Sequence, residues 1–127
     1  MTGTLSIPAS PGEVADKISI LRLKVERIAD PGRVANVGIE LDALRAAWVA
    51  AGLPELEALP EWPELVAVNT ALWEVEDALR EHEGRQDFGA HFVALARSVY
   101  RHNDHRAAIK KRINLALGSR IVEEKSW

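Results

Sequence analysis

Four polar residues recur on one face of a helix predicted near the C-terminus, where together they could bind an anion. At about 100° per residue they lie within about 40° of the direction of Phe92, on the face that Phe92 and Val99 are expected to bury: Asn103, Arg106, Lys110 and Asn114. Burying Arg or Lys alone costs several kcal/mol, so these cations require carboxylates or an anionic ligand. Arg suits bidentate contacts with phosphate or carboxylate, and Lys supplies a point charge.

The same segment departs from its own apolar pattern, and two interpretations fit. Ile109 and Ile113 lie about 60–100° away from that direction, so the apolar stripe rotates along the segment. In one interpretation the helix breaks at residues 102–104, and Asn103 or Asp104 caps a fifth helix that buries a different face. In the other, a continuous or kinked helix delivers the polar residues into a shared cleft. A break would not exclude a site, because a helix N-terminus itself attracts anions.

Polar residues on two other predicted helices could complete such a site. Lys17 lies beside the apolar stripe of the first helix, and Asn69 flanks the stripe of the third, close to Trp73. Flanking positions usually carry solvated charges, and a Trp there fills a core or interface more often than it stacks on a ligand. We predict that three helices build one ligand-binding cluster from these residues: Lys17, Asn69, Glu76, Asp77, Arg80, Asn103, Asp104, Arg106 and Lys110.

Each residue type in this cluster has an expected role. The cations contact the anion, namely Lys17, Arg80, Arg106 and Lys110. The acids orient those cations, or hold Mg²⁺ if a reaction is catalysed, namely Glu76, Asp77 and Asp104. Asn69 and Asn103 supply neutral hydrogen bonds. The pattern identifies no catalytic residue and no cofactor.

Apolar residues at steps of three and four predict the helices that position this cluster. Ser10-Pro11 and Asp30-Pro31 each place a capping residue before a proline, which predicts two helix starts. The stripes that follow are Val14, Ile18, Leu21, Val25 and Ile28, then Val34, Val37, Leu41, Leu44 and Trp48. Because their connection is short, these two helices should form an antiparallel hairpin.

A proline-rich segment separates this hairpin from the later helices. Residues 52–63 contain three prolines, which predicts a loop with at most one helical turn. A third stripe covers residues 65–79, and Asp87 is expected to cap a fourth helix that turns Phe88 inward. The predicted fold is all-α: a single domain over residues 1–127, an up-and-down bundle of four or five helices with short extended termini.

Composition and charge exclude several classes of protein. The chain has no cysteine, so it has no disulfide, thiolate metal site or cysteine nucleophile. The net charge is -3, yet residues 97–120 carry seven Lys or Arg against one Asp, which favours an anion site. Nucleic acid is not the expected partner, because domains that bind it usually carry an overall positive charge.

Two further kinds of site are not expected. No apolar run approaches the ~20 residues of a membrane span, and no signal peptide precedes the helices, so we expect a cytoplasmic protein without a membrane span. The four histidines, at positions 82, 91, 102 and 105, are expected at the surface. His102 and His105 are three apart and could share a metal, but no third ligand has a supporting spacing, so no metal is predicted.

Four blocks of the sequence carry a family resemblance: Ile7-Pro8-x-Ser10-x-Gly12-Glu13-x-x-Asp16-Lys17-Ile18-x-Ile20-Leu21, Val68-Asn69-x-x-Leu72-Trp73-x-x-Glu76-Asp77, Ala96-Arg97-x-Val99-Tyr100-x-x-Asn103-Asp104-x-Arg106-x-x-Ile109-Lys110 and Ser119-x-x-x-Glu123-Glu124-Lys125-Ser126. Together they resemble a small bacterial family catalogued as domain of unknown function 6165. The resemblance implies a module found alone or beside glycosyltransferases in cell-surface polysaccharide contexts, without an established activity. Trp127 stands where Tyr is expected, and we expect its ring to pack into a groove or against a partner.

These patterns lead to one main expectation and two alternatives. The main one is a small helical domain that binds an anionic small molecule, phosphorylated or a sugar nucleotide, through the predicted cluster. The first alternative is an interaction or dimerisation module, a homodimer or a partner of a glycosyltransferase, whose cluster is a structural salt-bridge network. The second is an enzyme of glycoconjugate metabolism in which the same residues perform acid–base chemistry.

Overall fold

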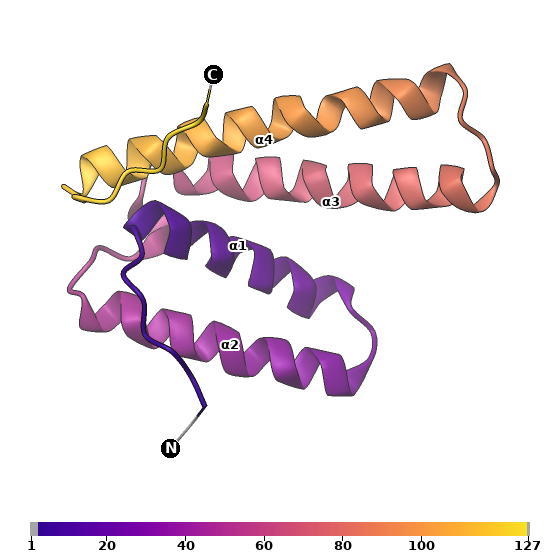
Figure 1. The fold of residues 1–127 in the computed structure, drawn as a ribbon. Coiled ribbons are helices and arrows are strands. Elements are labelled where there is room, and N and C mark those ends of the chain that lie inside the picture. The colour runs from indigo at the N-terminus through magenta and orange to yellow at the C-terminus, as the bar shows by residue number, and fades with distance from the viewer. Residues whose placement is uncertain (1–2, 127) are drawn as a thin grey trace.

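The computed structural model describes residues 3–126, and all of its regular structure there is helical (Figure 1). The elements are α1 (Pro11–Arg27), α2 (Pro31–Ala50), the short 3₁₀-helix η1 (Leu56–Ala58), α3 (Trp62–Gly84) and α4 (Ala90–Ala116). No strand forms within the described part of the chain, which confirms the all-α class.

Local capping explains where the first two helices begin. The Ser10 side chain accepts a hydrogen bond of 3.2 Å from the backbone of Glu13, and Pro11 occupies the first helical position. Asp30 caps α2 through a bond of 3.0 Å from the backbone of Gly32. Both starts were predicted from sequence and are confirmed.

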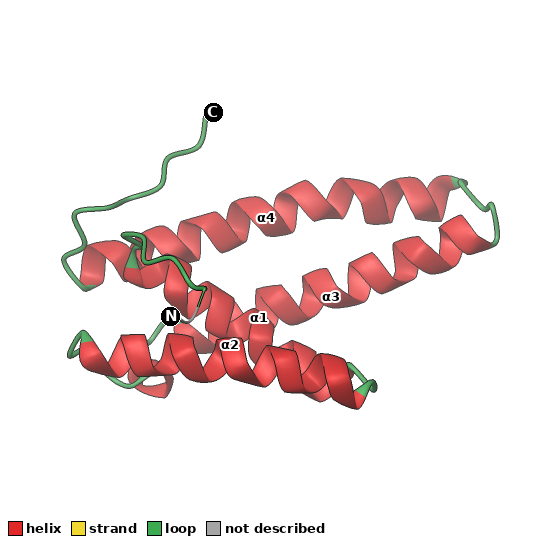
Figure 2. Cartoon of the chain, turned by 60° about the horizontal axis from the view of Figure 1, so that its bottom comes forward, coloured by secondary structure: helices red, strands yellow, loops and turns green. Residues whose placement is uncertain are grey.

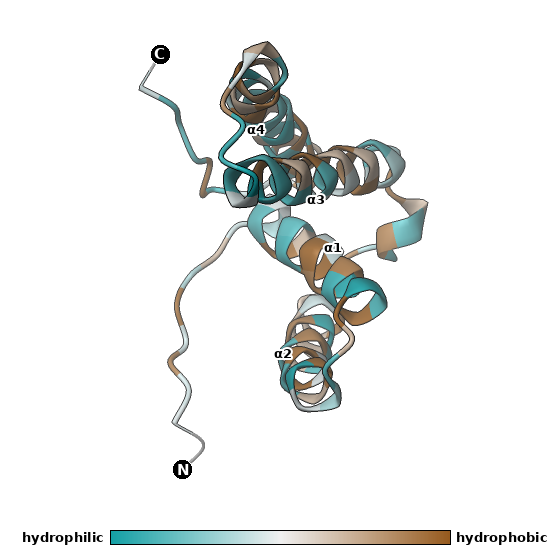
Figure 3. Cartoon of the chain, turned by 90° about the vertical axis from the view of Figure 1, so that its right-hand side faces the viewer, coloured by the Kyte–Doolittle hydropathy of each residue, from teal (hydrophilic) through white to brown (hydrophobic). Residues whose placement is uncertain are grey.

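Helix α1 is the centre of the fold. It contacts each of the other three helices, with α2 on one side and the α3–α4 hairpin on the other (Figures 1 and 3). Within each hairpin, α1–α2 and α3–α4, the two helices run antiparallel (Figure 1). The α3–α4 hairpin extends beyond α1 and α2 (Figures 1 and 2). The innermost apolar side chains come from three helices, namely Ile18, Leu65, Ile109 and Ile113.

The proline-rich segment between the hairpins is held in place by buried side chains. Leu56 and Leu59 enter the core, and η1 is the single turn predicted there. The indole nitrogen of Trp48 donates a hydrogen bond of 2.7 Å to the carbonyl of Pro54. Trp62 is buried at the start of α3, so the segment is a fixed connection and not a loose linker.

Helix α4 is continuous from Ala90 to Ala116, so of the two interpretations left open by the sequence the break at residues 102–104 is wrong and the continuous helix is correct. Neither Asn103 nor Asp104 caps a fifth helix, because both lie in the middle of α4. The apolar stripe rotates because α4 packs against α3 along its length and against α1 only near its C-terminal half (Figure 1). Ile109, in this half of α4, is fully buried in the core.

The tip of the α3–α4 hairpin corrects three predictions. Gly89, not Asp87, is the N-cap of α4. The Asp87 carboxylate lies just before this cap, where it accepts a hydrogen bond of 3.2 Å from the backbone of Gly89 and lies 3.3 Å from Nδ1 of His82. His82 was expected at the surface but is buried, with its Nε2 3.1 Å from Nδ1 of His91. Phe88 was expected inside but is 47% exposed, since the tip projects beyond the other helices.

The described terminal segments, residues 3–10 and 119–126, are non-helical. The packing predicted for Trp127 lies outside the described residues. No helix in the described part of the chain is long and apolar enough to cross a membrane.

Candidate functional site

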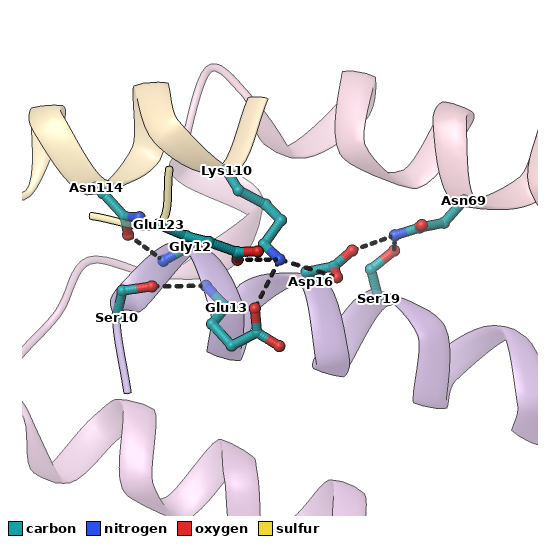
Figure 4. Close-up of polar contacts among 9 residues, drawn as sticks. All are labelled: Ser10, Gly12, Glu13, Asp16, Ser19, Asn69, Lys110, Asn114 and Glu123. Carbon is teal, nitrogen blue, oxygen red and sulfur yellow. Dashed lines mark hydrogen bonds and ion pairs between the residues drawn. The ribbon is translucent and has the colours of Figure 1, made fainter. Parts of the chain in front are cut away.

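The predicted cluster divides into a closed half and an open half, and Lys110 is the centre of the closed half. Its ammonium lies 2.6 Å from Glu13 and 3.8 Å from Asp16, both on α1 (Figure 4). Glu123, in the C-terminal segment, approaches it at 3.5 Å. With three carboxylates around one cation, Lys110 is fully compensated by the protein itself.

The pKa of Lys110 reflects this neighbourhood. Burial alone would lower it by penalising the charged form, but the hydrogen bond to Glu13 and the negative charges of Asp16, Glu13 and Glu123 outweigh burial. The net effect raises the pKa above its ordinary value of 10.5. Lys110 therefore stays charged at every physiological pH and stabilises the α1–α4 contact.

Asn69 joins α3 to the same network. Its amide nitrogen donates to Asp16 at 2.9 Å and to the hydroxyl of Ser19 at 3.2 Å (Figure 4). Because an ionised carboxylate only accepts hydrogen bonds, the nitrogen must face Asp16, which fixes the orientation of the amide. The Oδ1 atom of Asn69 is then buried without a hydrogen-bond donor. A buried acceptor left in this state costs about 1–3 kcal/mol.

The open half is a cavity of about 370 Å³ between α1, α3 and α4. Six of the nine predicted residues line it, namely Asn69, Glu76, Asp77, Arg80, Asn103 and Arg106. Its other walls are Ile20, Leu23, Lys24, Leu72 and Trp73. The volume lies at the lower end of the range of about 300–1,000 Å³ that small-molecule sites occupy.

A second cavity of about 420 Å³ adjoins the first along α1. Lys17 and Lys110 line it, and Ile20, Lys24 and Arg106 belong to both cavities. Eight of the nine predicted residues therefore lie around two adjoining cavities. The ninth, Asp104, faces a different depression beside Lys111 and the C-terminal segment.

The cations of the open half have no carboxylate partner within the described residues. The ten ion pairs among residues 3–126 involve none of these four side chains: Lys17, Lys24, Arg80 and Arg106. Glu76 and Asp77 share the first cavity with three of them but form no ion pair with any residue of the described chain. Lys110 is paired with carboxylates, whereas these four cations are not. The open half therefore carries positive charge that an anionic ligand could neutralise.

The predicted cluster omits several residues that the structure brings into these sites. Lys24 lies seven positions, or about two helical turns, after Lys17 on α1, and this spacing places the two side chains on the same face. Leu23 and Leu72 form apolar walls of the first cavity. Ser19 had no distinguishing signal, because its role depends on Asn69, fifty positions later.

No group of three or more metal-ligating side chains capable of holding an ion occurs among residues 3–126. Glu76 and Asp77 are neighbours that share one cavity, but no third carboxylate joins them there. No protein-family model, curated protein or solved structure matches the chain significantly.

Proposed function

We propose that the protein is a small-molecule-binding domain whose ligand is an anionic, phosphorylated compound held between α1, α3 and α4. The anion lies against Arg106 and Lys24, which belong to both cavities, with Arg80 and Lys17 at the two ends. A guanidinium offers two parallel donors to one phosphate, and an ammonium adds charge without fixed direction.

One observation carries this proposal: two adjoining cavities are lined by cations from three helices that form no ion pair within residues 3–126. A stable fold alone does not need this arrangement, because like charges repel and each long side chain could turn toward solvent. Lys110, in the same region, has the three carboxylate partners expected of a purely structural cation. Arg106, one turn earlier on α4, has none among the described residues.

A thermal-shift series tests the proposal with phosphate, pyrophosphate and UDP-glucose, each at millimolar concentration. Binding at a hundredfold excess over Kd stabilises the folded state by about 2.7 kcal/mol, which raises Tm by several degrees. Arg106→Ala should abolish the shift and leave the helical circular dichroism unchanged. Arg101→Ala is the matched control, because Arg101 is exposed on the same helix and lines neither cavity. The proposal fails if none of the three probes shifts Tm.

The interaction-module alternative is favoured by the closed half. Lys110, Glu13, Asp16, Asn69 and Ser19 satisfy one another without any ligand, as a structural network does. If the open half is also structural, Arg106→Met combined with Glu76→Leu should keep full stability and full partner binding. Size-exclusion chromatography with light scattering then decides whether the partner is a second copy.

The cellular context of the proposal comes from the sequence resemblance. We place this domain in the cytoplasm beside glycosyltransferases of a cell-surface polysaccharide pathway, where sugar nucleotides are the common phosphorylated substrates. If the domain is instead an enzyme that acts on such a ligand, Glu76 is the residue proposed as its general acid or base. In that case Glu76→Gln should eliminate turnover of a sugar nucleotide without eliminating its binding.

A further inference from the structure

The first cavity combines features that a simple anion would leave unused. Trp73, Leu72 and Leu23 form apolar walls that the second cavity lacks, whereas Lys24 and Arg106 are shared with the second cavity. The cavity therefore combines apolar walls from α1 and α3 with two cations that it shares with the second cavity. Inorganic phosphate would contact the cations and leave the apolar walls in water.

Asn69 adds a requirement for a hydrogen-bond donor. It lines the first cavity, it is 4% exposed, and its Oδ1 is buried without a donor. Its amide cannot reverse without placing that oxygen against the carboxylate of Asp16. Carboxylates and phosphodiesters carry no proton at neutral pH, so a ligand that satisfies this oxygen would do so with an N–H or O–H on another part of the molecule.

Resting on the function proposed above, we propose that the ligand is a nucleotide, with its base in the first cavity and its phosphates at Arg106 and Lys24. The flat base packs against the half-buried indole of Trp73 and the side chain of Leu72. A ring N–H or exocyclic amine of the base donates to Oδ1 of Asn69. A second phosphate extends along α1 toward Lys17 in the adjoining cavity.

Isothermal titration calorimetry on the full chain tests this orientation. The probes are the four common nucleoside diphosphates, their nucleosides and inorganic pyrophosphate. We expect at least one nucleoside diphosphate to bind tenfold or more tightly than both pyrophosphate and its own nucleoside, because only the nucleotide contacts both ends of the site. Equal affinity for pyrophosphate and every nucleotide would overturn the nucleotide assignment while leaving the anion site intact. An absence of binding by all probes, pyrophosphate included, would overturn both proposals.

The donor to Asn69 is tested on the ligand, so that the buried network stays unchanged. The best nucleotide is compared with its N-methylated form, in which the ring or amine donor is blocked, and we expect at least a tenfold loss of affinity. An unchanged affinity would show that the base does not donate to Asn69, and would overturn the assigned orientation.

Two variants at Trp73 test the packing of the base. Trp73→Phe keeps an aromatic surface and should retain nucleotide binding, whereas Trp73→Leu should weaken nucleotide binding and leave pyrophosphate binding unchanged. Circular dichroism confirms folding of each variant. Equal nucleotide affinities for the two variants would contradict a stacked base.

Discussion

The backbone amide of Gly12 donates a hydrogen bond of 2.7 Å to Oδ1 of Asn114, which lies 102 positions later in the chain. This bond satisfies one of the free amides at the start of α1 with a side chain of α4. Asn114 is fully buried, and this bond gives its Oδ1 a partner. The close approach of the two helices depends on the absence of a side chain at Gly12.

Gly12→Ala should therefore destabilise the fold. A Cβ at this position would lie 2.8 Å from Oδ1 of Asn114 and would collide with the carbonyl oxygen of Lys110. Moving α1 away from α4 to relieve this overlap should lower the free energy of unfolding by about 1–3 kcal/mol in urea denaturation. The control is Gly38→Ala in α2, where the added Cβ meets nothing within 4 Å. That change should raise stability by about 0.5–1 kcal/mol. Equal effects of the two changes would show that α1 and α4 do not meet at Gly12.

Lys110→Met should destabilise the protein far more than Lys111→Met. Removing Lys110 leaves Asp16, whose side chain is 6% exposed, without its compensating cation, at a cost on the order of 2–3 kcal/mol. Lys111 pairs with the exposed Glu124 in the C-terminal segment. Exposed pairs of this kind contribute less than about 1 kcal/mol. Chemical denaturation of both variants checks the difference, and similar losses would contradict a structural role specific to Lys110.

The parts of this fold that the sequence predicts are those set by local chemistry. Ser10 and Asp30 cap helices through partners two or three positions away, so the cap and its helix are read from the same few residues. Asp87 accepts the same kind of hydrogen bond from Gly89, two positions later, yet α4 begins only at Ala90, so this local contact alone does not identify the first helical residue. Periodicity also did not show whether α4 is continuous. A rotating apolar stripe fits a helix break, and it fits equally well a continuous helix that contacts both α3 and α1.

The candidate site was likewise predictable only where it depends on residues close together in the sequence. Helical spacing placed Arg106 and Lys110 on one face, and the structure places both beside α1. Spacing alone does not reveal that Lys110 is paired and Arg106 is not, because the partner of Lys110 is Glu13, 97 positions earlier. The orphaned oxygen of Asn69 was likewise invisible, since it depends on where Asp16 and Ser19 lie in space.

Glu64 should make stability fall in acid. A hydrogen bond from His105 and then the contact with Arg112 lower the pKa of this carboxyl below its ordinary value of 4.5. A depressed folded-state pKa contributes stability that is present above pH 4.5 and is lost as the pH falls through the folded-state value. Thermal unfolding between about pH 2.5 and 6 should show a shallower acid loss for Glu64→Gln than for the unmodified protein. Parallel curves would mean that Glu64 does not link α3 to α4.

Lys110 should produce the opposite dependence in alkali. Its pKa is raised in the folded state, so its contribution is complete below the unfolded value of 10.5 and is lost as the pH rises through the folded value. Urea unfolding from about pH 9 to 11.5 should therefore show a steeper alkaline loss for the unmodified protein than for Lys110→Met. Every other titrating group is common to the two proteins, so a difference in slope reports on Lys110 alone.

Arg106 should behave in the opposite way to Lys110 when no ligand is present. It has no ion-pair partner among the described residues, so Arg106→Gln removes no compensated charge and should change the free energy of unfolding by less than about 0.5 kcal/mol. The same variant should lose the stabilisation that a nucleoside diphosphate gives the unmodified protein, because the phosphate then lacks its guanidinium. Arg106→Lys, which keeps the charge but not the paired donors, should recover part of it. A loss of 2 kcal/mol or more in the absence of ligand would mean that Arg106, like Lys110, holds the helices together, and would place the whole cluster in the structural network.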